Sequence, residues 1–252
     1  MRSKGTRSEI ALVALTLVLG ACTAQQRAAG KIPVSMEEQY EEAIRKAAVR
    51  KADWNIPLWP LNDAATVSMS TFTQYNNLDT GNYYIWVSPT AQLSSMCKGK
   101  MDPVLALQQI LGLPPNQSPR PGNQWRVFIF DVASSNVFRP CPGGVDPNAQ
   151  PDKPRCVAGD ALDPKMNPEI TYFMLKQSWS AHHASTVRDG LTDFGYPWTG
   201  MGWTYDWDPL SKTNVGVSEF IVQRGTVLTN VRPVTPSEFC AKQPSSAAAV
   251  SH

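Results

Sequence analysis

The chain has 252 residues, of which 42% are hydrophobic and 17% are charged, and its formal net charge is +2. This length and apolar content suffice for one globular domain with a buried core. No basic stripe of the kind that nucleic-acid-binding proteins present is visible, so that class is set aside. The sequence contains no internal repeat of the kind that builds solenoid proteins.

The first 22 residues, MRSKGTRSEIALVALTLVLGAC, have the pattern of an export signal. Three basic residues precede a short apolar run at 10–19, which is too short to span a bilayer as a permanent helix. The run ends in Leu19-Gly20-Ala21-Cys22, which resembles the lipobox of bacterial lipoproteins. The sequence therefore predicts a signal peptide over residues 1–21.

The lipobox resemblance implies that Cys22 is the first mature residue and carries the acyl chains, so that the membrane is a partner of the protein. Several acyl chains give stable anchoring. Thr23, in place of aspartate, resembles lipoproteins that Gram-negative bacteria sort to the outer membrane. We expect a lipid-anchored protein of the cell envelope, with residues 22–34 as a tether that holds the folded body off the membrane. Without residues 1–21 the chain carries 20 basic and 20 acidic residues.

An amphipathic helix is predicted over residues 35–52. Ser35 and Glu38 form a capping-box pattern, and apolar residues recur every three or four positions. The apolar stripe consists of Met36, Tyr40, Ile44 and Ala47. Two interpretations remain open: the stripe packs on the chain's own domain, or it docks on a partner protein.

Residues 53–240 are predicted to form one α+β domain with a mainly antiparallel sheet, followed by a disordered tail over 241–252. A second helix begins with Asp102 as N-cap and Pro103 as its first residue. Gly225 lies between two apolar runs and predicts a β-hairpin there. Residues 170–176 fit a strand or a helix equally well. The expected strands are 66–73, 83–87, 125–132, 215–222 and 226–231.

Four cysteines beyond Cys22 indicate two disulfides in an exported chain. Cys141 and Cys156 bracket a loop dense in proline and glycine, so we favour their pairing, which leaves Cys97 to pair with Cys240. The long proline-rich loop 139–168 is then stapled rather than functional. The rival interpretation is a cysteine nucleophile with a histidine base, although no local motif around any cysteine supports it.

No complete catalytic motif is present. The candidates for general acid–base chemistry are His182 and His183, with Asp189 nearby in sequence, because imidazole titrates near neutrality. Adjacent histidines diverge on a regular helix or strand, and no spacing typical of a metal site occurs. We therefore expect no metal and no cofactor.

The segment 195–207, GYPWTGMGWTYDW, is rich in aromatic residues and glycine. Trp203, Tyr205 and Trp207 share one side if this stretch is a strand, where they would stack a sugar or hold a peptide, with Asp206 bonding hydroxyl groups. The alternative is that the row faces inward and forms the core.

These observations predict a non-catalytic, lipid-anchored envelope protein that binds an envelope protein or a cell-wall glycan or peptide. One alternative is a periplasmic or surface hydrolase that uses His182 or His183 as general base. The other is a structural subunit that docks through helix 35–52.

Overall fold

The computed structural model describes residues 34–49, 54, 56–61, 65–115, 119, 121–157, 162–182 and 195–241. All the helices and strands of the described residues lie in the unit 35–252. The helices are α1 (Met36–Ala48), α2 (Thr90–Cys97), α3 (Pro103–Ile110), α4 (Pro168–His182), α5 (Pro236–Phe239) and the 3₁₀ turn η2 (Ser134–Asn136). The strands are β1 (Thr66–Thr73), β2 (Ile85–Pro89), β3 (Arg126–Ala133), β4 (Val137–Phe138), β5 (Trp203–Tyr205), β6 (Val215–Ser218), β7 (Phe220–Val222) and β8 (Thr229–Val234).

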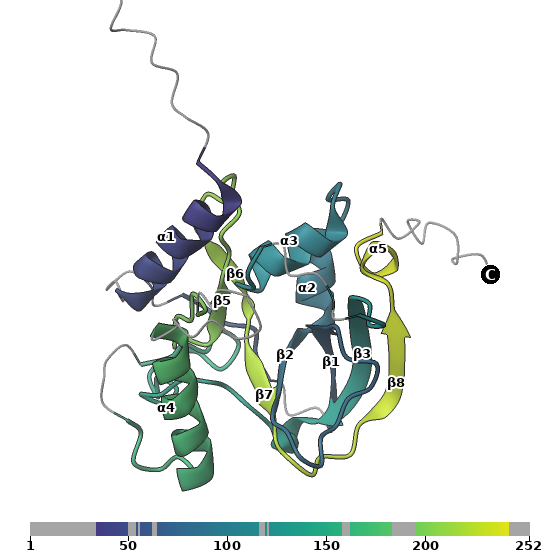
Figure 1. Cartoon of the computed structure of the whole chain (residues 1–252). Coiled ribbons are helices and arrows are strands. Elements are labelled where there is room, and N and C mark those ends of the chain that lie inside the picture. Colours follow the sequence, from purple (N-terminus) through teal and green to yellow (C-terminus); the bar gives the residue numbers. More distant parts are fainter. Residues whose placement is uncertain are drawn as a thin grey trace, which may run out of the picture. The chain divides into compact units, whose positions relative to one another are not determined.

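The fold is α+β, with one large antiparallel sheet as predicted. Its six strands run in the order β4-β7-β2-β1-β3-β8, and every neighbouring pair is antiparallel. β3 lies inside the sheet because it pairs with β1 along its whole length and with β8 on its other side. A second sheet contains only β5 and β6. In Figure 1 these two strands lie between α1 and the large sheet, and β8 and α5 close the opposite edge.

The predicted hairpin at Gly225 is wrong. β7 pairs with β2 on one side and with β4 on the other, so neither of its edges is available to the strand that follows. The chain instead turns at Gly225, whose N–H donates to the carbonyl oxygen of Thr80, and β8 joins β3 at the far end of the sheet. A glycine with positive φ fits such a turn as well as it fits a hairpin.

The predicted strand 215–222 is divided at Glu219 into β6 and β7, which belong to different sheets, and the other local predictions hold with shifts in boundaries. The capping box of α1 forms between Ser35 and Glu38, and Asp102 caps α3 by accepting from the N–H of Leu105. The predicted strand at 83–87 is found two residues later, as β2. The ambiguous stretch 170–176 is part of the 15-residue helix α4.

The apolar stripe of α1 packs on the chain's own domain. Tyr40, Ala43 and Ala47 are buried in a cluster that includes the aromatic side chains of β5. The Tyr40 hydroxyl reaches the carbonyl oxygens of Gly112 and Gly195, at 3.2 and 2.9 Å. α1 is therefore attached to two loops that are far from it in sequence.

Both predicted disulfides are present, Cys97–Cys240 and Cys141–Cys156. The first links the end of α2 to the end of the described chain, across 143 positions, and the second closes the proline-rich loop. All four sulfurs belong to buried residues. Among the described helices none is long and apolar enough to cross a membrane.

Candidate functional site

The aromatic row of residues 203–207 lies in the core. Trp203, Tyr205 and Trp207 are 1%, 4% and 3% exposed. The Trp207 indole N–H donates to the carbonyl oxygen of Leu113, and the Trp203 ring stacks on Tyr205 at 6.4 Å between centroids. These three side chains do not form an exposed stacking surface, and of the three only Tyr205 lines a cavity.

Asp206, the polar member of that group, has a local structural role. Its Oδ1 atom accepts from the backbone N–H of Asp208, and its backbone oxygen accepts from the side-chain amide of Asn214. Burial raises the pKa of the Asp206 carboxyl group. The carboxylate therefore organises the turn after β5.

The acid–base candidates are placed only in part. His182 is the last residue of α4, whereas His183 and Asp189 lie outside the described residues, as does Cys22. The described part of the chain contains no group of three or more His, Cys, Asp or Glu side chains suited to a metal ion.

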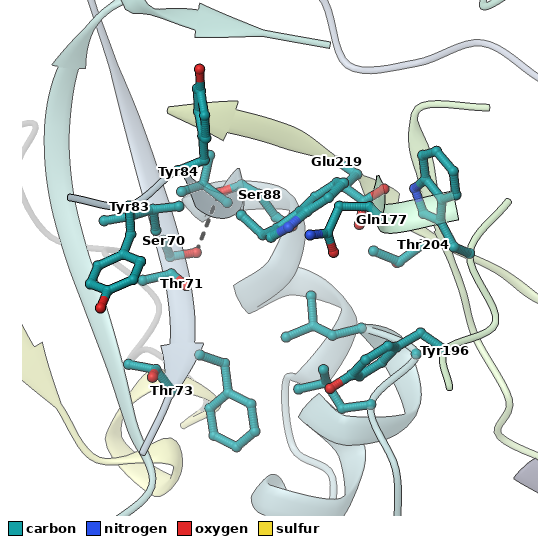
Figure 2. Close-up of a pocket in the computed structure, with 18 of the residues that line it drawn as sticks. Ser70, Thr71, Thr73, Tyr83, Tyr84, Ser88, Gln177, Tyr196, Thr204 and Glu219 are labelled. Carbon is teal, nitrogen blue, oxygen red and sulfur yellow. Dashed lines mark hydrogen bonds between the residues drawn. The ribbon is translucent and has the colours of Figure 1, made fainter. Parts of the chain in front are cut away.

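A cavity of about 700 Å³ opens between the large sheet, α4 and the loops that flank β5. Figure 2 shows Glu219, Gln177 and Thr204 gathered at one end of it, and Thr71, Thr73 and Tyr83 at the other. Its volume lies in the range of pockets that bind small molecules. Strands β1 and β2 supply one wall, with residues 70–73 and 85–88.

Aromatic rings line the cavity from its mouth to its interior. Tyr83, at 66% exposure, and Tyr75 are open to solvent, whereas Trp198 is buried. The ring of Trp198 meets that of Trp86 edge to face, at 6.4 Å between centroids. The aromatic lining thus extends from exposed rings at the rim to a buried ring in the interior.

Glu219 reaches the cavity because the chain changes sheet at this residue. β6 ends at Ser218 and pairs with β5, while β7 begins at Phe220 and pairs with β2. The N–H of Glu219 donates to the carbonyl oxygen of Gly202, 2.9 Å away. The break between the two strands thus places a carboxyl group between the two sheets.

Glu219 is partly buried, with the Oε2 atom of its carboxyl group enclosed, and no basic side chain of the described lining pairs with it. Desolvation raises its pKa from 4.5 to about 8, and the facing Trp198 indole offsets that rise only in part. Neither Glu219 Oε2 nor Trp198 Nε1 forms a hydrogen bond of good geometry. Unsatisfied polar atoms are rare in protein interiors, and a carboxyl group with a strongly raised pKa in a pocket marks a candidate functional site.

The cavity contains acidic but no basic side chains among its described lining. Glu219 and Asp79 are its only residues with a carboxyl group, and Lys, Arg and His are absent from that lining. Arg139 lies close by, but its guanidinium stacks on the ring of Phe220 and donates to the carbonyl oxygen of Trp59. The pocket is therefore suited to a neutral or cationic ligand and unsuited to an anion.

Sequence reasoning overlooked Glu219, Trp86 and Gln177. A signal for Glu219 was present, since a charged residue interrupts the apolar stretch GVSEFIV. The other two are ordinary residues of a strand and a helix, and nothing in the sequence shows that they approach one another.

No protein-family model matches the chain, and comparison with the curated proteins and with the solved structures finds no match either.

Proposed function

We propose that this protein is a lipid-anchored component of the cell envelope that binds a ligand, without chemical conversion, in the cavity beside Glu219. The observation that carries the binding function is the cavity of about 700 Å³ with its aromatic walls and a few polar groups. The lipobox at Cys22 supports the envelope location. Two disulfides fit an oxidising compartment outside the cytoplasm.

The ligand class we favour is a fragment of the cell wall, either glycan or peptide. Aromatic rings stack on the faces of sugars and on apolar parts of peptides, and Gln177, Thr71 and Thr73 offer groups that donate and accept hydrogen bonds. An envelope-anchored protein meets this polymer at high concentration. Helix α1 buries Tyr40, Ala43 and Ala47 on its own domain, and the apolar side chains that it and its flanking residues expose are at its two ends, Val34 and Met36 at the start and Ala48 and Val49 at the end. Docking through α1 therefore receives less support than ligand binding.

A hydrolase remains the second candidate because of Glu219. A carboxylic acid that keeps its proton at neutral pH can donate it to a leaving group. Gln177 and Ala181 of α4 line the same cavity, and His182 follows directly in the chain. An enzyme of this kind would release fragments from its polymer.

Sedimentation with purified peptidoglycan separates the two functions. For a binding protein we expect the protein to pellet with the polymer while mass spectrometry of the supernatant detects no new fragments. If the wild-type protein releases fragments and the Glu219→Gln variant does not, the function is hydrolysis and not binding alone. Failure of the folded protein to pellet would overturn the cell-wall assignment.

Lipid anchoring is tested separately. We expect mass spectrometry of the mature protein to detect acyl chains on Cys22, and the Cys22→Ser variant to leave the membrane fraction. If the variant still sediments with membranes and the mature protein has no added acyl mass, the anchor is not the one proposed.

A further inference from the structure

The charge of the cavity and its aromatic walls restrict the ligand further. We propose that the cavity binds an organic ammonium ion, with Glu219 as its counter-ion and the rings of Trp86 and Trp198 as its walls. This assignment rests on the proposed binding function and names the chemical group that the site recognises.

The first argument is the unpaired carboxyl group. Glu219 is partly buried, and the Oε2 atom of its carboxyl group is enclosed by protein without a hydrogen-bond donor of good geometry. The absence of basic residues from the described lining means that the chain provides no cation for it there. A buried carboxylate is stable only when it is paired, so a cation supplied by the ligand would complete the site.

The second argument is the aromatic lining. An ammonium group is attracted to the face of an aromatic ring, most strongly to tryptophan, and pockets for methylated ammonium groups use several such rings. Trp86, Trp198 and Tyr84 come from two separate segments and line the cavity, and the Trp198 indole faces the Glu219 carboxyl group. Trp86 and Trp198 already meet at 6.4 Å, so the interior presents aromatic surface beside the carboxyl group.

Asp79 is the other residue of the described lining with a carboxyl group. It is ionised at neutral pH, because hydrogen bonds from the side-chain amide and the backbone N–H of Asn82 lower its pKa, and these bonds already partner its two oxygens. Arg224 packs on the ring of Tyr84 and pairs with Glu169. Arg139, which does not line the cavity, packs on the ring of Phe220 and donates from Nη2 to the carbonyl oxygen of Trp59, while its Nη1 atom has no hydrogen-bond partner. The tyrosines of the lining are Tyr75, Tyr83, Tyr84, Tyr196 and Tyr205.

Binding of an ammonium ion requires the ionised carboxylate, so the carboxyl group must release its proton to the buffer as the ligand enters. Because the pKa of Glu219 in the free protein is about 8, affinity should rise with pH up to that value and then level off. A neutral ligand that accepts a hydrogen bond from the protonated acid would show the opposite trend. The direction of the pH dependence thus distinguishes a cation from a sugar.

The test compares choline with 3,3-dimethylbutan-1-ol, which has nearly the same shape without the charge. We expect choline to bind and its Kd to fall about tenfold from pH 6 to 7 and about fivefold from pH 7 to 8. The alcohol should bind at least about tenfold more weakly than choline at pH 8. Calorimetry at pH 6.5 in two buffers of different ionisation enthalpy should detect release of about one proton per choline. Equal affinities for the two compounds would overturn the proposal, as would affinity for choline that falls with pH.

Variants locate the effect at the pocket. Glu219→Gln should weaken choline binding at pH 8 by at least about tenfold and abolish proton release, because the amide cannot balance the ligand's charge. Asp152→Asn removes one carboxylate from an exposed loop residue outside the cavity and should leave the Kd unchanged. Equal losses in both variants would mean that overall charge attracts choline. If Glu219→Gln does not fold, proton release by the wild-type protein still tests the proposal, and binding of choline without proton release would overturn it.

The outcomes for the ligand group and for the cell-wall function are separable. Choline binding with proton release, together with failure to pellet with peptidoglycan, would keep the ammonium site and overturn the cell-wall ligand. Pelleting with peptidoglycan without choline binding would keep the proposed function and overturn the ammonium site.

Discussion

At the residue scale, Glu219 couples stability to pH. Burial raises its pKa above the value in the unfolded chain, so the folded state holds a proton that the unfolded state loses as pH rises. The folded state is then disfavoured progressively between about pH 4.5 and about pH 8, by at most ~1.4 kcal/mol per pH unit. Below this range both states are protonated, and above it both are ionised.

We therefore predict that Glu219→Gln flattens this dependence. The variant should be more stable than wild type at pH 8 by a few kcal/mol and nearly equal to it at pH 4, because an amide does not ionise. Urea unfolding at a series of pH values measures the difference. A constant difference across the range would show that the carboxyl group is not desolvated in the folded protein.

Gly216, also in the 215–222 segment, is required for steric reasons. A Cβ atom there would collide with Thr204 Oγ1 and with the carbonyl oxygen of Ile110. Because the carbonyl belongs to the backbone, it cannot move aside cheaply, and Gly216→Ala should lower the free energy of unfolding by about 3 kcal/mol. Gly122→Ala, where the new Cβ meets open space, is the control and should lose only about 1 kcal/mol for its positive φ. Equal losses, measured by urea unfolding, would contradict the steric explanation.

At the element scale, α1 fastens the loops on which the pocket is built. The Tyr40 hydroxyl contacts the carbonyl oxygens of Gly112 and Gly195, and the residues next to these glycines line the cavity. Through this contact, a helix at the start of the domain supports loops of the cavity that lie later in the chain.

We predict that Tyr40→Phe lowers the free energy of unfolding by about 1–3 kcal/mol, because it removes the buried hydroxyl that contacts the carbonyl oxygens of Gly112 and Gly195. Tyr172→Phe removes a hydroxyl from an exposed side chain of α4 and should change stability by less than about 0.5 kcal/mol. Thermal and urea unfolding of both variants provide the comparison. A Tyr40→Phe variant as stable as wild type would mean that the hydroxyl makes no net contribution.

The segment 215–222 shows how two sheets divide one apolar run. Its pattern predicts a single strand, whereas the structure splits it at Glu219 between β6 and β7. The split follows from pairing partners, β5 for the first half and β2 with β4 for the second. Such partners lie far apart in sequence, so local alternation cannot reveal the break.

At the scale of the whole molecule, the two disulfides close loops of very different length, 143 and 15 positions. Their four cysteines are similarly buried, so the variants create similar changes in the core. In the chain-entropy model the longer loop contributes about 5 kcal/mol and the shorter about 3 kcal/mol, because a longer closed loop restricts the unfolded chain more.

The corresponding prediction compares two double variants. Replacing Cys97 and Cys240 by alanine should destabilise the protein more than replacing Cys141 and Cys156, with a difference of about 2 kcal/mol. Urea unfolding without reductant measures both. A larger loss from the shorter loop would show that the Cys141–Cys156 bridge acts mainly on the folded state.

The sequence by itself determined the features that depend on neighbouring residues. The capping box at Ser35, the Asp102 cap before Pro103 and the strands at 66–73 and 125–132 follow from contacts a few positions apart. The disulfide pairing was also predictable, since the proline-rich loop left one sensible partner for Cys141.

Only the tertiary structure decided which residues meet. Trp203, Tyr205 and Trp207 had the composition of a binding surface, but packing against α1 and the loops buries them. The cavity instead combines β1, β2, α4 and Glu219, segments separated by up to about 150 positions. Burial and pairing depend on such distant contacts, whereas periodicity reports only on a residue's immediate neighbours, so the site could not be derived from the sequence alone.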